Sequence, residues 1–431
     1  MKLFKTIYEL RSFLILWSSQ TVSALGTAMT NYALVIWAYQ QKGTASSITL
    51  LSVCSFLPSI LFCFAAGTLA DRWDKKRLML VSDTVAAMGT ATILLLYSTN
   101  TLQLWHLYII NFILSFMNAF QNPASNVAQS LIIPEKHYAR TSGLQAFANS
   151  LVTVLTPAIA VALLAFGGIQ TVLIVDLSSF AVAFLALLLF IKIPPIHESG
   201  EAKVPFLQGC LTGLRFLREH RALFSLILFF SFVNLMASLA GNAIMPAMIL
   251  SRTNQNQITL GMVSSAIGIG MLVGSLLATA APPAKRRTRV IFISCAVSFL
   301  LCDLLWGLGR SEAVWVFAAF AGNLPLPLIG VNITTIMRTK VPIEMQGRVF
   351  ATRDTLQFTT IPLGLFLGGV LADKVFEPFM LSPSPLQHAL SLAVGTGKGS
   401  GMAVIFLITG VVGFVTNLIC LRSPVLKELD T

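Results

Sequence analysis

The sequence contains little charge for its length. Of its 431 residues, 11% are Asp, Glu, Lys or Arg and 55% are hydrophobic, whereas about a quarter of the residues in soluble domains are charged. Apolar runs of about 20 residues, long enough to cross a bilayer as a helix, recur along the chain. The composition therefore predicts a multi-pass membrane protein. In such a protein the net charge of +12 indicates basic loops at the membrane surface rather than a nucleic-acid partner.

Residues that carry catalysis or bind metals are also scarce. The chain has five His and six Cys, and the Cys residues fall mostly inside apolar runs, without the spacing of a metal site. It contains no nucleotide-binding loop and no constellation of nucleophile and base. The sequence therefore predicts no enzyme, no cofactor and no metal site. A scaffold or signalling role would call for a sizeable extramembrane domain, and none is expected.

Twelve apolar runs are expected to form transmembrane helices, which predicts an all-α membrane protein. The expected spans are residues 12–38, 46–70, 78–98, 104–125, 141–166, 170–191, 222–249, 258–281, 289–309, 313–333, 349–372 and 401–421. With an even number of spans, both termini lie on the same side. That side holds 24 of the 29 Lys and Arg residues, and the positive-inside rule makes it cytoplasmic. We therefore expect a cell-membrane protein with both termini in the cytoplasm.

Similar short patterns recur about 207–210 positions apart. Glu9-Leu-Arg11 resembles Glu219-His-Arg221, and Gly67 corresponds to Gly274, each pair at the start or end of a span. These offsets predict two parallel six-helix repeats, residues 1–193 and 221–431. Residues 194–220 form the expected cytoplasmic linker. In this linker one helical face, opposite Arg215 and Arg218, carries the apolar residues Phe206, Leu207, Cys210, Leu211, Leu214 and Leu217. This pattern predicts an amphipathic helix on the membrane surface.

A charged segment between the second and third spans points to a family. It begins at Gly67 and continues as Asp71-Arg72-Trp-Asp74-Lys75-Lys76-Arg77. Further stretches that point to the same family are Asn122-Pro-Ala124, Val175-Asp-Leu-Ser-Ser179, Gly347-Arg-Val-Phe350 and Ile361-Pro-Leu-Gly364. Together with the two repeats, they make essentially the whole chain resemble the major facilitator superfamily, in particular its macrolide-efflux branch of drug:proton antiporters. This resemblance implies two six-helix halves around a central cavity, the major facilitator fold.

The resemblance implies that the charged segment acts as a gating latch. Asp71 would face the cytoplasmic end of the eleventh span, where exposed amide groups favour an anion. The candidate gating residues are Gly67, Asp71, Arg72, Asp74, Lys75, Lys76, Arg77, Gly347 and Arg348. The alternative is that Lys75, Lys76 and Arg77 serve only to set the topology. In the second repeat, Ala278 stands where an acid would match Asp71.

Polar side chains form stripes on spans that the resemblance places around the cavity. The candidate cavity residues are Gln20, Thr27, Asn31, Asn111, Asn118, Asn122, Asn234, Ser238 and Asn242. On the first and fourth spans the spacing of +7 and +4 keeps three of them on one helical face. Hydrogen bonding between helices is the alternative role for each residue. The middles of these helices contain no Asp or Glu, which favours a bulky, largely apolar substrate over a small ion.

Proton coupling requires a carboxylate that can meet solvent on either side in turn. The candidates are Asp176, Asp303 and Asp354. Asp83 is a further acid near a cytoplasmic helix end. For Asp176 and Asp303, structural hydrogen bonding is the alternative interpretation. Antiport with protons is implied by the resemblance and is not visible in the residues themselves.

The predicted function is secondary active export of a bulky, largely apolar compound, such as a macrolide-like drug or natural product, in exchange for protons. Alternatives with the same fold are an exporter of a siderophore or another metabolite, and a nutrient importer. The expected partners are the small-molecule substrate, protons and the lipid bilayer. We expect a monomer that binds no nucleic acid.

The latch hypothesis predicts that Asp71→Asn cripples transport because the amide loses the charge attracted to the helix end. The variant should still reach the membrane. Efflux is measured together with the amount of protein in the membrane. Normal efflux at normal abundance would show that the charge of Asp71 is not needed.

Overall fold

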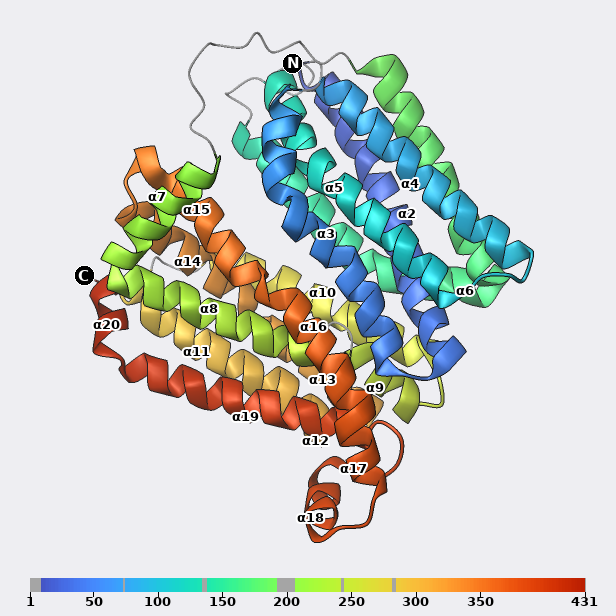
Figure 1. Ribbon diagram of the computed structural model, residues 1–431, viewed down its shortest axis with the longest axis vertical. Helices are drawn as coiled ribbons and strands as arrows, with labels where there is room; N and C mark the ends of the chain where they lie inside the picture. The colour runs from blue at the N-terminus through green and yellow to red at the C-terminus, as the bar shows by residue number, and fades with distance from the viewer. Residues whose placement is uncertain are drawn as a thin grey trace. The chain divides into compact units, whose positions relative to one another are not determined.

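The described residues are helical throughout. The computed structural model describes residues 9–72, 74–133, 138–191, 206–241, 244–280 and 284–430, and within these ranges there is no β-strand (Figure 1). Contacts between Cα atoms divide the chain into two units. Unit 1 comprises Met1–Trp37 and Cys54–Ala202, and unit 2 comprises Ala38–Val53 and Lys203–Thr431.

Five long helices supply unit 1. They are α2 (Arg11–Lys42), α3 (Ala45–Arg72), α4 (Lys75–Ser98), α5 (Leu104–Ile132) and α6 (Tyr138–Phe190), and the adjoining ends of α2 and α3 belong to unit 2. Helix α4 packs on α5 and α6. Residues from α2, α4, α5 and α6 share a core that contains Leu16, Met79, Phe120 and Leu187. The core of this unit therefore lies among helices that are distant in sequence.

Helix α6 contains a break where two spans are expected. Gly167 and Gly168 leave the helical conformation, and Gly168 has φ +66° and ψ −166°. Non-glycine residues rarely adopt this backbone conformation. The break lies between the expected spans 141–166 and 170–191, as the sequence predicts.

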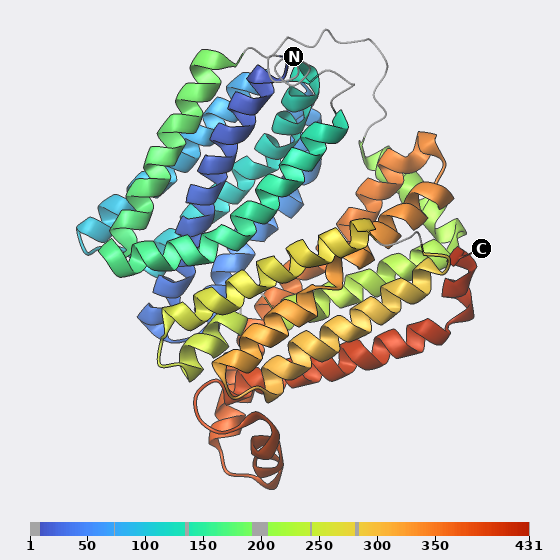
Figure 2. The same cartoon turned by 180° about the vertical axis from the view of Figure 1, so that it is seen from behind.

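Unit 2 contains the remaining helices (Figure 2 shows them from behind). The first group is α7 (Phe206–Glu219), α8 (Arg221–Ala240), α9 (Ile244–Arg252), α10 (Gln257–Ala280), α11 (Arg287–Phe299), the π-helical turn η2 (Leu300–Leu304) and α12 (Leu305–Leu308). The second group is α13 (Glu312–Asn323), α14 (Leu326–Lys340), α15 (Ile343–Phe358), α16 (Thr360–Leu371), the π-helical turn η3 (Ala372–Phe376) and α17 (Glu377–Leu381). The chain ends with α18 (Pro385–Val394), α19 (Ser400–Arg422), α20 (Pro424–Lys427) and the 3₁₀ turn η4 (Glu428–Asp430).

Eight helical segments among the described residues are long and apolar enough to cross a membrane. They are Lys75–Ser98, Phe147–Phe190, Arg221–Arg252, Gln257–Ala278, Arg287–Leu308, Glu312–Met337, Thr352–Leu381 and Ser400–Arg422. At 1.5 Å per residue, the 24 residues of α4 extend for about 36 Å, against a hydrocarbon core of about 30 Å. The protein therefore crosses the membrane several times. The count of twelve spans and the two repeats remain predictions.

Helix α7 packs within unit 2 partly by the apolar face assigned from the sequence, to which Leu217 belongs, and partly by the neighbouring Phe216. Its Phe216 and Leu217 are buried in a core shared with Leu226, Phe292 and Val349. Arg215 and Arg218 are exposed. Phe216 lies outside the apolar face assigned from the sequence, because that pattern does not show which neighbouring helix will cover it.

Helices α8 and α16 lie side by side (Figure 1). A Cβ atom added to Gly368 would be 2.2 Å from the carbonyl oxygen of Leu239, and one added to Gly364 would be 2.7 Å from the carbonyl oxygen of Leu235. Only a residue without Cβ allows backbones to approach this closely. The two glycines therefore determine the separation of α8 and α16.

We expect Gly368→Ala to destabilise the protein by about 1–3 kcal/mol, since the added methyl group forces two backbones apart. The matched control is Gly330→Ala in α14, where a Cβ would meet no atom within 4 Å. Thermal unfolding of the purified protein in detergent compares the two variants. Equal unfolding temperatures would contradict the close contact.

Candidate functional site

The charged segment between α3 and α4 connects helix ends in unit 1. Asp74 is the N-cap of α4, and its Oδ1 accepts from the Arg77 backbone N–H at 2.8 Å. Lys76 Nζ donates to the carbonyl oxygens of Leu188 and Ile191 at 2.9 and 2.7 Å. These carbonyls lie at the C-terminal end of α6, where a cation is favoured. Asp74 and Lys76 thus stabilise the ends of two helices, a role that spacing alone does not indicate.

The other gating candidates are described less fully. Gly67, Asp71 and Arg72 lie in the last turns of α3, and Gly347 and Arg348 lie in α15. Their side chains are outside the described part of the structure, so the latch stays a prediction. Lys75 is buried and Arg77 is exposed.

Among the described side chains of unit 1, the most enclosed carboxylate is that of Asp176, on the second part of α6. Its side chain is 1% exposed. Oδ2 accepts hydrogen bonds from Thr30 at 2.8 Å and Thr90 at 3.2 Å, and Oδ1 accepts one from Thr27 at 3.3 Å. Three hydroxyl groups from α2 and α4 therefore surround one acid from α6. No Lys, Arg or His of the described residues forms an ion pair with it.

A glycine brings α2 close to this acid. A Cβ on Gly26 would lie 2.9 Å from Asp176 Oδ1 and 2.4 Å from Ser179 Oγ. The missing side chain lets α2 approach α6 closely enough for Thr27, the next residue, and Thr30, one turn further on, to reach the carboxylate. The sequence shows no pattern that would have grouped these residues.

A second buried carboxylate in unit 1 is bound by amides. Asp83, on α4, is 5% exposed. It accepts from Gln121 Nε2 at 2.5 Å and from Gln20 Nε2 at 3.4 Å. Asp83 lies in the first half of α4 and is buried inside the unit, because α2 and α5 cover it. Gln20, proposed for the cavity, is one of its partners.

The remaining cavity candidates of unit 1 fall into two groups. Asn111 is buried, donates to the Leu107 carbonyl at 2.9 Å and accepts from Ser55 Oγ at 3.1 Å. Asn31 and Asn118 are exposed. The side chain of Asn122 is outside the described part. Thr27 and Asn111 thus bind within the unit, while Asn31 and Asn118 present free amide surface.

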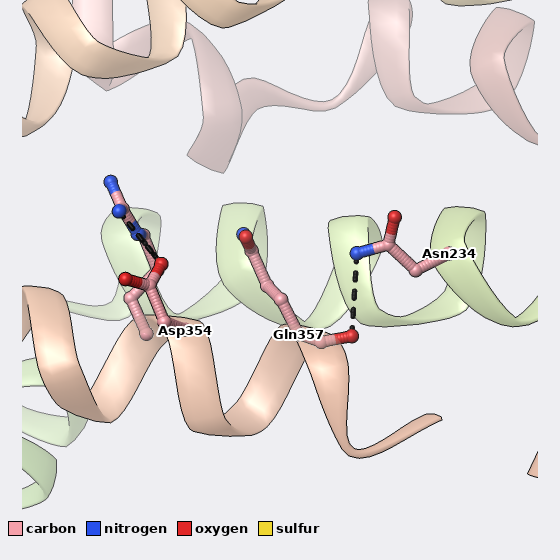
Figure 3. A network of polar contacts seen from close by, with 4 residues as sticks. Asn234, Asp354 and Gln357 are labelled. Carbon is pink, nitrogen blue, oxygen red and sulfur yellow. Dashed lines mark hydrogen bonds and ion pairs between the residues drawn. The ribbon is translucent and has the colours of Figure 1, made fainter. Parts of the chain in front are cut away.

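In unit 2, a polar network joins α8 to α15 (Figure 3). Asn234 Nδ2 donates to the Gln357 carbonyl at 3.3 Å, and Ser231 Oγ donates to the Leu356 carbonyl at 2.8 Å. Asp354 pairs with the adjacent Arg353 at 2.7 Å. Asp354 therefore differs from Asp176 in having a cation beside it. Ser238 is buried against Gly364, and Asn242 is outside the described residues.

Asp303 lies in the π-helical turn η2. Its Oδ1 accepts from Thr409 Oγ1 of α19 at 3.2 Å. Gly410 allows the two helices to approach, since a Cβ there would lie 2.8 Å from the Leu304 backbone nitrogen. Single π-helical turns occur frequently at functional sites. Asp303 is thus, after Asp176, a second carboxylate that accepts a hydrogen bond from a threonine hydroxyl in the described structure.

Other acids of unit 2 bind helix N-termini, which the sequence did not indicate. Asp373, in η3, accepts from the backbone N–H groups of Ala45 and Ser46 at 3.0 and 2.7 Å. Glu377 accepts from Gly399 and Met402 at 3.3 and 3.1 Å. Exposed amides at a helix start favour an anion. Asp373 and Glu377 therefore cap the starts of α3 and α19.

No group of three His, Cys, Asp or Glu side chains in the described residues is placed to hold a metal ion. The polar sites of both units consist instead of carboxylates, amides and hydroxyls on long apolar helices. A sequence model of the Major Facilitator Superfamily matches residues 16–365. The chain belongs to the major facilitator superfamily. It is therefore a multi-pass membrane transporter of a family that is not enzymatic.

Two relatives of this superfamily member are named as efflux proteins. It is 24% identical to macrolide efflux protein A of Streptococcus pyogenes over 367 residues, which cover 84% of this chain and 90% of the relative. It is 25% identical to the multidrug efflux pump Tap of Mycobacterium tuberculosis (strain CDC 1551 / Oshkosh) over 435 residues, which cover 97% and 94%.

Solved structures of transporters have the same fold at low sequence identity. A bacterial homologue of the iron transporter ferroportin matches with a TM-score of 0.66 and 11% identity, covering 96% of this chain and 99% of that one. The nucleoside transporter NupG matches with a TM-score of 0.62 and 11% identity, covering 95% and 99%. These likenesses concern the fold alone.

The contacts of Lys76 predict that Lys76→Met lowers stability by about 1 kcal/mol, because two carbonyls at the end of α6 lose a charged donor. Arg77→Met is the matched control, since Arg77 is exposed on the same turn. Thermal unfolding in detergent measures both. An equal loss in the two variants would assign the effect to net charge.

Proposed function

We propose that this transporter exports a bulky, largely apolar compound, of the macrolide or multidrug kind, in exchange for protons. Support for export comes from relatives named as efflux proteins, which align with 84–97% of the chain. The substrate class is supported by the neutral polar groups of the candidate cavity residues, which offer amides rather than a fixed charge.

One observation supports the exchange with protons. The carboxylate of Asp176 is 1% exposed and takes hydrogen bonds from three neutral threonine hydroxyls. A buried carboxylate without a cation is costly in the membrane, and taking up a proton removes that cost. A hydroxyl can also accept a hydrogen bond, so the same threonines would accommodate the protonated acid.

The three threonines also connect the acid to other helices. Thr27 and Thr30 lie on α2 and Thr90 lies on α4, while Asp176 lies on α6. A change in the charge of Asp176 therefore changes the bonds between three helices of unit 1. In our proposal, protonation alters the stability of this helix contact and so biases the conformation of the unit.

The direction of transport is tested with everted membrane vesicles. A macrolide is added with ATP-generated or artificial proton gradients, with and without a protonophore. We expect uptake into everted vesicles, which corresponds to export from the cell, and its loss with the protonophore. Uptake into right-side-out vesicles alone would identify an importer, and uptake that resists the protonophore would exclude proton exchange.

We predict that Asp176→Asn abolishes macrolide accumulation driven by a pH gradient in proteoliposomes but retains exchange of labelled for unlabelled macrolide. The amide keeps the shape of the acid and removes the titrating group. The matched control is Glu312→Gln at the exposed start of α13, which should behave as the unmodified protein. Unchanged gradient-driven transport by Asp176→Asn would exclude Asp176 as the proton-exchanging carboxylate. If only Asp303→Asn abolished gradient-driven transport, the proton site would be assigned to Asp303 in unit 2.

A further inference from the structure

A hollow in unit 2 is surrounded by cations at the start of α11 and the end of α19. Its volume is about 730 Å³. The lining residues are Lys285, Arg286, Thr288, Arg289, Leu421, Arg422, Lys427 and Asp430. We call this hollow the basic pocket. Five of its eight residues are Lys or Arg, and one is acidic.

The walls of the basic pocket are held in place by the last residues of the described chain. Leu426 and Leu429 are buried in the core of unit 2. Asp430 Oδ1 accepts from the backbone N–H of Thr288 at 2.9 Å, and Oδ2 accepts from its hydroxyl at 2.5 Å. The chain after α19 therefore turns back onto the start of α11 and closes one side of the pocket.

Within the described ranges, none of the five cations of the basic pocket has a recorded ion pair. The ion pairs recorded for the described residues, Arg215–Glu219 and Arg353–Asp354, lie elsewhere. In unit 1, the comparable basic segment uses Lys76 to cap α6. In unit 2, Asp430 binds the helix start through Thr288 instead of pairing with the cations. The basic pocket thus concentrates positive charge around an open volume, which favours a bound anion.

Exposed apolar side chains lie on the same two helices, beyond the basic pocket. Ile293 lies four residues after Arg289 on α11 and is 42% exposed. Leu418 lies four residues before Arg422 on α19 and is 43% exposed. A separation of four residues places each apolar side chain on the same helical face as its arginine. The cations therefore lie at the end of a surface suited to acyl chains.

We propose that the basic pocket binds the phosphate headgroup of an anionic phospholipid, with its acyl chains along the apolar face of α11 and α19. Basic pockets between transmembrane helices bind such headgroups on the cytoplasmic side. The distribution of Lys and Arg predicts that this end of the helices is cytoplasmic. The proposal depends on neither the substrate nor the proton exchange.

The test measures lipid retained by the purified full-length protein. The protein is placed in vesicles of phosphatidylcholine with increasing dioleoylphosphatidylglycerol, and native mass spectrometry counts bound lipids after extraction. Arg289→Gln with Arg422→Gln should weaken phosphatidylglycerol binding about 25-fold, at about fivefold for each charge. Arg215→Gln with Arg218→Gln on α7 removes the same charge from the same predicted side and should change binding little. Equal weakening in both pairs would show general attraction to a basic surface and overturn the proposal.

Two further measurements complete the test. One uses a variant expected to bind lipid more tightly, which a misfolded protein would not do, and the other distinguishes a lipid from a soluble anion. Asp430→Asn keeps an oxygen acceptor for Thr288 and removes the negative charge of the pocket, so phosphatidylglycerol binding should strengthen about fivefold. Unchanged or weaker binding would contradict the proposal. Inorganic phosphate is also titrated into delipidated protein in detergent. If phosphate binds at millimolar or lower concentration and displaces phosphatidylglycerol, the pocket serves a soluble anion and the lipid proposal fails.

Discussion

The need to satisfy backbone groups at helix ends governs where this protein places its few charges. A helix leaves four N–H groups and four carbonyls without internal partners, and a bilayer core supplies none. Acidic side chains bind four helix starts, and basic side chains bind helix ends. The acids are Asp74, Asp373, Glu377 and Asp430, and the bases are Lys76 and Arg252, which reaches the carbonyls of Gly309 and Val394. The helix lengths and turns of both units depend on these contacts.

Against this background, three acids have a different environment. Asp83, Asp176 and Asp303 lie within helices, and their side-chain partners in the described structure are amides and hydroxyls. A helix start presents partial positive charge to the acid that caps it, whereas neutral amide and hydroxyl donors carry no net charge to offset a buried carboxylate. Structural capping therefore explains the first group and does not explain the second. That distinction, and not burial alone, separates Asp83, Asp176 and Asp303 from the capping acids, and our proposal assigns the proton exchange to Asp176 among them.

Periodicity and composition predict the features of this protein that depend on residues close together in the sequence. Hydropathy predicted apolar helical segments and a boundary between residues 141–166 and 170–191, where α6 is broken, because these features depend on neighbouring residues. The partner of a polar side chain depends on distant residues. Asp373 binds Ala45 across more than 300 positions, and Asn111 and Asn118 share a helical face but are buried and exposed respectively. A spacing of seven residues places two side chains on the same helical face, but it does not show which of them a neighbouring helix will cover.

The basic segments before α4 and before α11 meet the same requirement, an acid at the helix start, but they form different surfaces. Before α4, Asp74 caps the helix from the adjacent position and Lys76 is engaged by α6. Before α11, the N-cap residue is Arg286, which makes no side-chain capping bond, so the carboxylate comes from Asp430 at the far end of the sequence. Because Asp430 comes from another segment, the backbone that carries it lies against the start of α11 and forms one wall of the basic pocket. The cations of the second segment therefore border a pocket, while Lys76 of the first completes the end of a helix.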